Sequence, residues 1–372
     1  MSKGRLEDHI LQKVIFREFR ARYPRLHGKN AVKGYHGFGG SVTIAQLITD
    51  QGASGWGALC SSLEEAKSAV KHIVGQPVCA LLDPAHGMTN PVLRPFDIAL
   101  HDLAGVILDM PVSKMINPGA VSAVRVYDGA IYMNDIIPEE HPFGVEAVLQ
   151  DCRDDWKLGH RIFKIKIGRG FQWMSHDEGM KRDIEIVKGI HALFPSAPLM
   201  VDANNGYSLQ DAIDFLNAIE GVPIYWFEEP FFENEEEDRA LHAFLDRNRP
   251  GTLIADGEMK PDIPQLLDLA AKGVLDILQP DVCGYGFTPW RSLMQKMVEK
   301  GFLASPHAWG DVVKTHYCAH LAAAYPHHIP CVEAVLGDSE GIDASGYTLH
   351  ESMLTVPDLP GFGMKLVWAP EV

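Results

Sequence analysis

The segment FKIKIG at residues 163–168 is the first of seven short apolar runs in this sequence that end in ionisable side chains. The other six are LMVDAN (199–204), YWFEEP (225–230), LIADGE (253–258), ILQPD (277–281), FLASPH (302–307) and PCVEAV (330–335). Their ionisable ends are 23 to 36 residues apart, about the length of one strand with its covering helix. This spacing predicts a β/α barrel, whose strand ends share one rim and carry catalytic groups.

The rest of the chain completes a two-domain organisation. VRVYDGA (124–130) is an eighth strand candidate, and eight strands are enough to close a barrel. Before it, residues 13–24 and 39–57 predict two strands, the second ending in the turn-rich GASGWG, and two helical patterns follow. We expect an α+β domain at 1–123, an α/β barrel at 124–345, and a Pro- and Gly-rich tail at 346–372 that packs back on the first domain.

Charge and composition exclude several classes of partner. The formal net charge of −16 disfavours nucleic acid and anionic membranes, which are bound by clustered Lys and Arg. The first residues, MSKGRLEDHILQK, resemble neither a signal peptide nor a membrane anchor, so we expect a cytoplasmic protein. Six scattered cysteines without CxxC spacing are typical of reduced, mostly buried thiols.

Three successive strand candidates end in carboxylates, at Asp202, Glu228 and Glu258. Converging carboxylates repel one another unless a cation lies among them, and hard oxygen ligands suit Mg²⁺. We therefore predict that these three residues bind Mg²⁺. Asp256 precedes Glu258 by two residues and faces the same way on a strand, which leaves open whether it joins the metal shell.

Two lysines and a carboxylate–imidazole pair complete the rim. Strand alternation sends Lys164 and Lys166 to one face, and each cation is expected to lower the pKa of the other toward that of a base. Asp281 and His307 end the next strands and predict an orienting carboxylate with a histidine base. Glu333 follows as either a protonated hydrogen-bond donor to a substrate carboxylate or a simple salt-bridge partner.

These residues meet one chemical need. Removing a proton alpha to a carboxylate builds charge on the carboxylate oxygens, and a divalent cation stabilises the resulting ene-diolate.

With these residues in this order, the chain resembles the enolase superfamily, in its mandelate racemase subgroup, from about residue 99 to LPGFGM (359–364). The resemblance implies an α/β fold with a (β/α)7β TIM-type barrel, an N-terminal α+β capping domain completed by the C-terminal tail, and Mg²⁺. Lys166 stands in the place of the family's base, with Lys164 before it. The metal ligands fall on Asp202, Glu228 and Glu258.

The resemblance further places the subgroup's Asp–His dyad on Asp281 and His307, and its hydrogen-bonding acid on Glu333. HGKNAVKGYHGFGG (27–40) corresponds to a substrate lid that is rich in Lys, His and Gly. The candidate substrate contacts are Tyr23, Arg25, His27, Lys33, Asn204 and Trp309.

The polar lid favours a polyhydroxylated carboxylate, so we expect dehydration of an aldonate or aldarate to a 2-keto-3-deoxy acid. The same first step also serves racemisation, epimerisation or cycloisomerisation, and a catalytically silent metal-binding protein is a third alternative. The expected partners are a small carboxylate substrate, with no nucleic acid or membrane, and further copies of the chain in a homo-oligomer.

Overall fold

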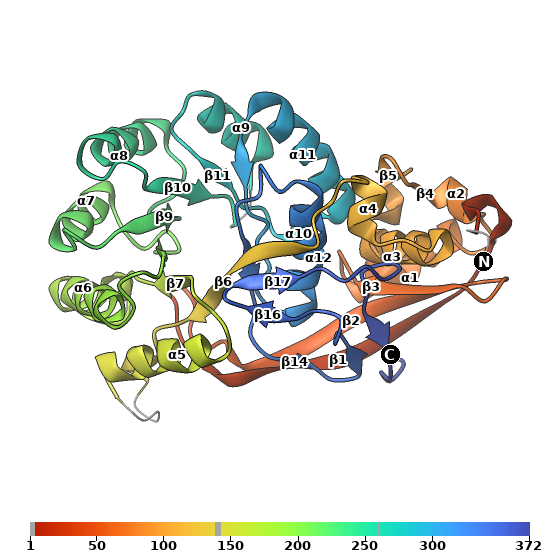
Figure 1. The fold of residues 1–372 in the computed structure, drawn as a ribbon, viewed down its shortest axis with the longest axis horizontal. Coiled ribbons are helices and arrows are strands. Elements are labelled where there is room, and N and C mark those ends of the chain that lie inside the picture. Colours follow the sequence, from red (N-terminus) through yellow and green to blue (C-terminus); the bar gives the residue numbers. More distant parts are fainter. Residues whose placement is uncertain (1–3, 138–142, 259–260) are drawn as a thin grey trace.

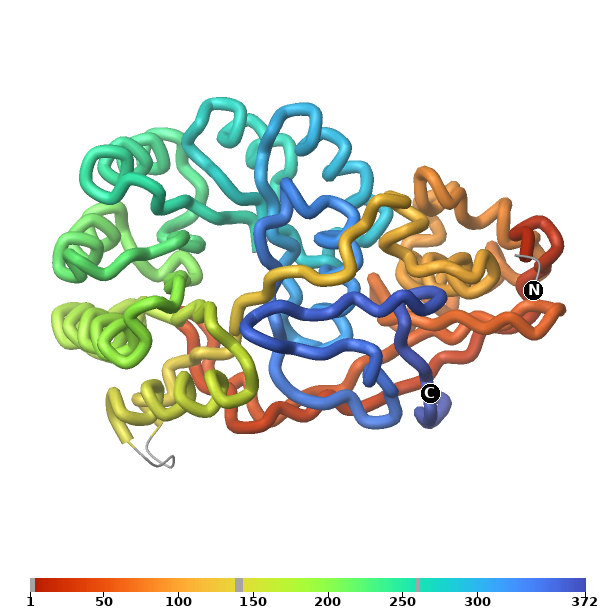
Figure 2. Tube along the Cα trace, viewed as in Figure 1, coloured from red at the N-terminus to blue at the C-terminus, as the bar shows by residue number. Residues whose placement is uncertain are grey.

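The computed structural model describes residues 4–137, 143–258 and 261–372 (Figures 1 and 2). The first three residues of the N-terminal stretch discussed above therefore lie outside the described residues.

A four-stranded antiparallel sheet, in the order β14-β1-β2-β3, forms the N-terminal part. Its strands are β1 (Leu11–His27), β2 (Gly37–Thr49), β3 (Ser54–Ala58) and β14 (Asp338–Ser339). Residues 54–57, predicted as a turn, instead form most of β3, whose Gly55 and Trp56 pair with Leu47 and Gln46 of β2. The N-terminal part thus has three consecutive strands where two were predicted.

Helices cover this sheet on one side (Figure 1). They are η1 (Leu6–Asp8), α1 (Leu63–Ala69), η2 (Val70–His72), α2 (Val78–Leu81), η3 (Pro91–Phe96), α3 (Asp97–Leu108) and α4 (Val112–Ile116), with the short strands β4 (Leu82–Asp83) and β5 (Gly87–Met88) between them. Helix α1 begins as its sequence predicts, because the Ser62 hydroxyl and the Glu65 carboxylate each accept a backbone N–H of the other residue.

Eight parallel strands form the second part. They follow one another in chain order from β6 to β12, while β13 pairs with β6. They are β6 (Ala123–Ile131), β7 (Phe163–Lys166), β8 (Leu199–Asp202), β9 (Ile224–Glu228), β10 (Leu253–Asp256), β11 (Ile277–Leu278), β12 (Leu303–Ala304) and β13 (Val332–Ala334). Between the last two, Ser305 Oγ donates to the Cys331 carbonyl at 2.9 Å.

Helices surround these strands on the outside (Figure 1). They are α5 (Val145–Lys157), α6 (His176–Leu193), α7 (Leu209–Ala218), α8 (Glu235–Asn248), α9 (Ile263–Ala271), α11 (Phe287–Lys300) and α12 (Val312–Ala324). The short helices η4 (Asn134–Ile136), η5 (Arg169–Phe171) and α10 (Val282–Tyr285) lie in the connections that follow β6, β7 and β11.

The two faces of the parallel sheet carry separate apolar clusters. Tyr127, Met200 and Trp226 belong to a small inner cluster, whereas alternate residues such as Phe163 and Val201 belong to the main core that the helices cover. Lys164 is paired with Met200 in the sheet and lies over the Tyr127 ring. The predicted strand alternation therefore places this lysine on the inner face.

The C-terminal segment runs back across both parts of the molecule (Figure 2). It contains β15 (Ile342–Asp343), β16 (Leu349–His350), β17 (Met353–Thr355) and β18 (Lys365–Leu366). Strand β17 pairs with β6, whereas further along the backbone N–H of Phe362 donates to Asp102 of α3 at 2.8 Å. Within the described ranges, no helix is both long and apolar enough to cross a bilayer.

Candidate active site

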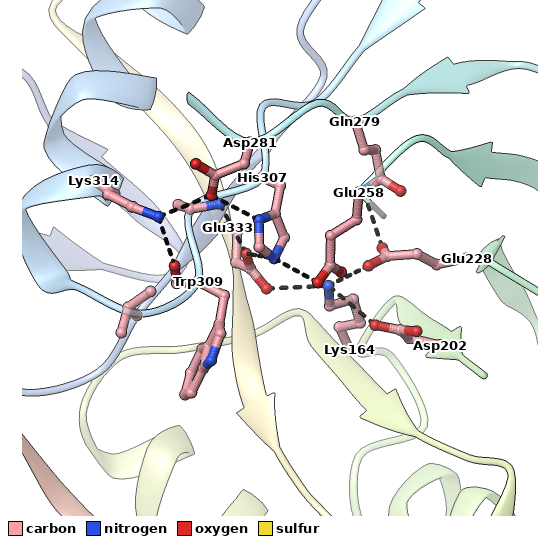
Figure 3. Close-up of polar contacts among 12 residues, drawn as sticks. Lys164, Asp202, Glu228, Glu258, Gln279, Asp281, His307, Trp309, Lys314 and Glu333 are labelled. Carbon is pink, nitrogen blue, oxygen red and sulfur yellow. Dashed lines mark hydrogen bonds and ion pairs between the residues drawn. The ribbon is translucent and has the colours of Figure 1, made fainter. Parts of the chain in front are cut away.

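The ends of β7, β8 and β9 bring two lysines and two carboxylates together in the interior. Figure 3 shows Lys164 with Asp202 and Glu228. Lys164 Nζ forms ion pairs with Glu228, with Glu333 Oε1 at 3.0 Å and with Asp202 Oδ2 at 3.4 Å. Lys166 Nζ is ion-paired with Asp202. Both lysine side chains are buried, so these charges are held by one another rather than by water.

The expected lowering of the Lys166 pKa is wrong for this structure. Burial and the neighbouring Lys164 both lower the pKa of Lys166, but Asp202, Glu258 and Glu228 outweigh them and raise it. The same balance raises the pKa of Lys164. The neighbouring carboxylates thus outweigh both burial and the mutual repulsion of the two lysines.

The three carboxylates predicted as metal ligands lie close enough to share one ion. Asp202, Glu228 and Glu258 each offer an oxygen within 4.8 Å of the other two. Glu258 Oε2 is buried without a hydrogen-bond partner among the described residues, as expected of an oxygen that awaits a ligand. All three donors are hard oxygens, so the set fits Mg²⁺.

Asp256 does not join this group of oxygens. Its Oδ1 accepts the Gly257 N–H at 2.6 Å, and burial, reinforced by Glu229 and Glu233, raises its pKa well above the usual range. Glu258 is therefore the acid at the end of this strand that meets Asp202 and Glu228.

Asp281 and His307 form a hydrogen-bonded pair on the other side of the carboxylates. His307 Nδ1 lies 3.0 Å from Asp281 Oδ2, while its Nε2 lies 3.3 Å from Glu258 Oε1 and 3.6 Å from Glu333 Oε2. Burial lowers the pKa of His307, but Glu258, Glu333 and Asp281 together raise it to about 9. The imidazole thus bridges the orienting aspartate and the carboxylate triad.

Glu333 is an ion-pair partner rather than a protonated donor. Although burial opposes ionisation, Lys164 and His307 lower the pKa of Glu333 to about 2. Its Oε2 accepts the Ala308 N–H at 3.0 Å. Of the two expectations for this residue, the salt bridge applies in this structure.

Tyr23, His27 and Trp309 gather in one aromatic cluster with Tyr132. The His27 ring stacks on Tyr23 at 4.2 Å between centroids and lies 5.1 Å from Trp309. His27 is fully buried, neither ring nitrogen has a hydrogen-bond partner among the described residues, and burial lowers its pKa to about 2. The cluster lies beside the lysines, since Lys166 Nζ is 5.7 Å from the Tyr132 ring.

Arg25, Lys33 and Asn204 differ in their surroundings. Arg25 lies within β1 and is engaged by two acids of α5, Asp155 Oδ1 at 2.6 Å and Asp151 Oδ1 at 3.1 Å. Lys33 is exposed, whereas Asn204 is buried and its N–H donates to the metal-ligand candidate Asp202 at 2.9 Å. The Arg25 guanidinium is therefore occupied by two acids and joins β1 to α5.

Several side chains at the site were not predicted. Gln279 Nε2 and Trp226 Nε1 both donate to Glu228 Oε2, at 3.0 and 3.1 Å, and Lys314 Nζ lies 2.9 Å from Asp281 Oδ2. Gln279 directly precedes the Pro-Asp at the end of its strand run, which is the one local signal that could have identified it.

Known proteins resemble this chain over most of its length. A sequence model of the enolase C-terminal domain-like family matches residues 147–369. The D-galactarolactone cycloisomerase of Agrobacterium fabrum is 26% identical over 87% of this chain and 88% of its own. The residues matched by the family model include all the strand ends from β7 to β13.

Two solved structures share the whole architecture. A galacturonate dehydratase from Geobacillus sp., in complex with D-galacturonate and 5-keto-4-deoxy-D-galacturonate, has a TM-score of 0.89 and 31% identity, covering 97% of this chain and 95% of its own. A mandelate racemase/muconate lactonizing protein from Geobacillus sp. Y412MC10, in complex with magnesium and tartrate, has a TM-score of 0.90 and 31% identity, covering 98% and 94%. Such neighbours imply an α/β TIM barrel with a capping domain. The chain therefore belongs to the enolase superfamily, in its mandelate racemase/muconate lactonizing subgroup.

Proposed function

We propose that this protein is a Mg²⁺-dependent dehydratase of acid sugars. The observation that carries the proposal is the arrangement of Lys166 and His307, which contact different members of one carboxylate triad, Asp202 and Glu258. A substrate carboxylate bound to the cation at the triad would have Lys166 on the side of Asp202 and His307 on the side of Glu258 as proton-transfer groups.

Asp202, Glu228 and Glu258 would hold the cation, and their geometry and the unpartnered Glu258 oxygen support this assignment. When bound, Mg²⁺ supplies positive charge that stabilises the substrate carboxylate oxygens as charge builds on them. The cation would also compensate the acidic excess that raises the pKa of Lys166.

The protein's own residues carry out the proton transfers. One of Lys166 and His307 removes the proton alpha to the carboxylate, and the other protonates the departing β-hydroxyl, which leaves as water. The enol that remains takes a proton at the former hydroxyl carbon and loses the proton of its enol hydroxyl, which gives the keto acid. Asp281 fixes His307 with Nδ1 toward itself, so that Nε2 faces the reaction.

Hexuronates are the first substrates to test, since the galacturonate dehydratase is similar over nearly the full length of both chains. In a hexuronate the proton on C5 is alpha to the carboxylate and the C4 hydroxyl is the leaving group, so the product is a 5-keto-4-deoxy acid. An aldonate or aldarate would give the 2-keto-3-deoxy acid by the same steps. His27, Trp309 and Asn204 are the proposed contacts for the sugar hydroxyls.

The test is incubation with Mg²⁺ and a panel of D-galacturonate, galactarate, galactonate and arabinonate in D₂O. We expect one acid to yield a keto acid with a single solvent deuterium at the former hydroxyl carbon, and Lys166→Met to abolish this product. Lys272→Met, at an exposed lysine paired with Glu235 and Asp268, should retain activity. Absence of keto acid from all four would count against a dehydratase of these acids.

The second candidate is an epimerase, racemase or cycloisomerase, which the two-sided arrangement and the cycloisomerase relative both favour. It predicts deuterium exchange at the alpha carbon without loss of water. A catalytically silent metal-binding protein would bind Mg²⁺ and show neither exchange nor elimination, but it has no need for the Asp281–His307 pair.

We further propose a closed (β/α)7β barrel at 124–345, a capping domain at 1–123, and a tail at 346–372 that completes this domain. The pairing of β13 with β6 and the Phe362–Asp102 bond support these assignments. A homo-oligomer in the cytoplasm, acting on a small carboxylate and on neither nucleic acid nor membrane, completes the proposal. Light scattering would test the oligomer.

A further inference from the structure

The Asp281 carboxylate is held at both oxygens. Its Oδ1 caps α10 by accepting the backbone N–H groups of Cys283 at 3.0 Å and Gly284 at 2.6 Å. Its Oδ2 faces two side-chain donors, His307 Nδ1 at 3.0 Å and Lys314 Nζ at 2.9 Å. With two donors on each oxygen, the carboxylate cannot rotate without losing one of them.

Lys314 lies in the first turn of α12 and approaches Asp281 from the side opposite the carboxylate triad (Figure 3). Its side chain is 20% exposed, and Nζ also donates to the Trp309 carbonyl at 3.0 Å. Burial alone would lower the pKa of Lys314, but Asp281 more than offsets this and raises it. The lysine is therefore a fixed cation within the interior of the site.

We propose that Lys314 is a positioning residue for His307, an inference that rests on the proposed function because it assigns a proton transfer to that imidazole. By holding Asp281 Oδ2 in place, Lys314 fixes the direction of the hydrogen bond to His307 Nδ1. The opposite nitrogen, Nε2, then stays directed at the triad, where it lies 3.3 Å from Glu258.

Lys314 also connects the Asp281–His307 pair to the aromatic cluster of the site. The Trp309 ring packs against Tyr23 of β1 at 5.4 Å and against Tyr132 at 5.0 Å. Because the same ammonium group binds the Trp309 carbonyl and Asp281, one residue fixes both the proton-transfer group and a proposed substrate contact. A lysine that was only part of the first turn of α12 would need neither the bond to Asp281 nor the bond to the Trp309 carbonyl.

The test compares Lys314→Met, Lys314→Arg, His307→Asn and the control Lys272→Met in one assay. The turnover and KM of an accepted acid sugar are measured in D₂O, together with the ratio of alpha-proton exchange to elimination. Because both events come from the same folded molecules, partial unfolding cancels in this ratio. A positioning role therefore changes the ratio, whereas a purely structural role leaves it unchanged.

We expect Lys314→Met to lower kcat by about 10- to 100-fold with KM changed less than about threefold. Its exchange-to-elimination ratio should shift in the same direction as that of His307→Asn. Lys314→Arg should recover part of the lost rate, and Lys272→Met should match the parent protein. A Lys314→Met variant that keeps the parent exchange-to-elimination ratio, whatever its kcat, would overturn the proposal.

A second measurement does not depend on turnover. A crystal structure of metal-free Lys314→Met is expected to show Asp281 rotated, or the His307 ring turned away from Glu258. Unchanged orientations of both side chains would overturn the proposal. If the parent protein acts on none of the acids, the proposed function fails, while the crystal structure still decides whether Lys314 positions His307.

Discussion

Glu228 is held by two side-chain donors, one in β9 and one directly after β11. We expect these hydrogen bonds to strengthen Mg²⁺ binding. Gln279 and Trp226 both donate to Glu228 Oε2, which leaves Oε1 to face Lys164. Replacing Gln279 by Leu should weaken Mg²⁺ binding by about 10- to 100-fold, because residues that orient a ligand carry that share of affinity. Calorimetric titration with Mg²⁺ measures it, with the exposed Gln265→Leu as control. Equal affinity in the two variants would contradict the assignment.

A second prediction concerns Arg25, whose ion pairs with Asp151 and Asp155 join β1 to α5. Its guanidinium meets Asp155, which is fully buried, and removing one partner of a buried pair costs about 3–5 kcal/mol. Arg25→Met should therefore lower the free energy of unfolding in urea by that amount and leave KM nearly unchanged. The exposed Arg22→Met, whose partner is Glu340, should cost less than about 1 kcal/mol. A large rise in KM without loss of stability would instead support Arg25 as a substrate contact.

Arg25 and Asp202 show which contacts of a single residue could be predicted from the sequence and which could not. Asp202 ends an apolar run of barrel spacing, so its neighbours follow from the repeat. The partners of Arg25 lie 126 and 130 residues away on α5, and Lys314 sits in an ordinary helix pattern. Side-chain pairs between distant elements leave no local pattern, so neither role was predictable from one sequence.

At the scale of elements, the contact between β3 and α3 depends on glycine. A Cβ added at Gly57 would lie 2.5 Å from Ile98 Cγ2 and 2.7 Å from the Ala99 backbone nitrogen. The segment GASGWG looked like a turn because glycine usually marks one, but here glycine allows a helix to approach a strand closely. Helix α1 had a capping signal and α3 an apolar periodicity, which is why these helices were predicted and β3 was not.

This contact can be tested by adding a single methyl group. Gly57→Ala should destabilise the fold by about 1–3 kcal/mol, the cost of overpacking against a backbone that cannot move far. Gly40→Ala in β2 is the matched control, since an added Cβ there meets nothing within 4 Å. Thermal unfolding of both variants makes the comparison. Equal stability would show that α3 can move away from the sheet at little cost.

At the scale of the whole molecule, His320 is a junction of three segments. From α12 its Nδ1 accepts the Ser113 N–H of α4 at 3.0 Å, and its Nε2 meets the hydroxyl of Tyr347, in the C-terminal segment, at 2.9 Å. The ring is fully buried, and burial lowers its pKa to about 3. The unfolded chain, with a histidine pKa of about 6.5, binds this proton at a higher pH than the folded protein does.

The sign of the pH dependence follows from that difference. Above about pH 6.5 the ring is neutral in both states, and its titration does not change the free energy of unfolding. As the pH falls toward 3, the unfolded state binds a proton that the folded state excludes, so the free energy of unfolding decreases. At about pH 5 the loss is about 2 kcal/mol. His320→Gln lacks this titration, so its stability deficit against the parent protein should shrink by that amount between about pH 8 and pH 5. Urea unfolding at both pH values measures the change, and His86→Gln, at a side chain that is 75% exposed, is the control. A deficit that stayed constant would mean that the folded protein accepts the proton on His320, and that the contacts of α12 with α4 and Tyr347 adjust to a charged ring without unfolding.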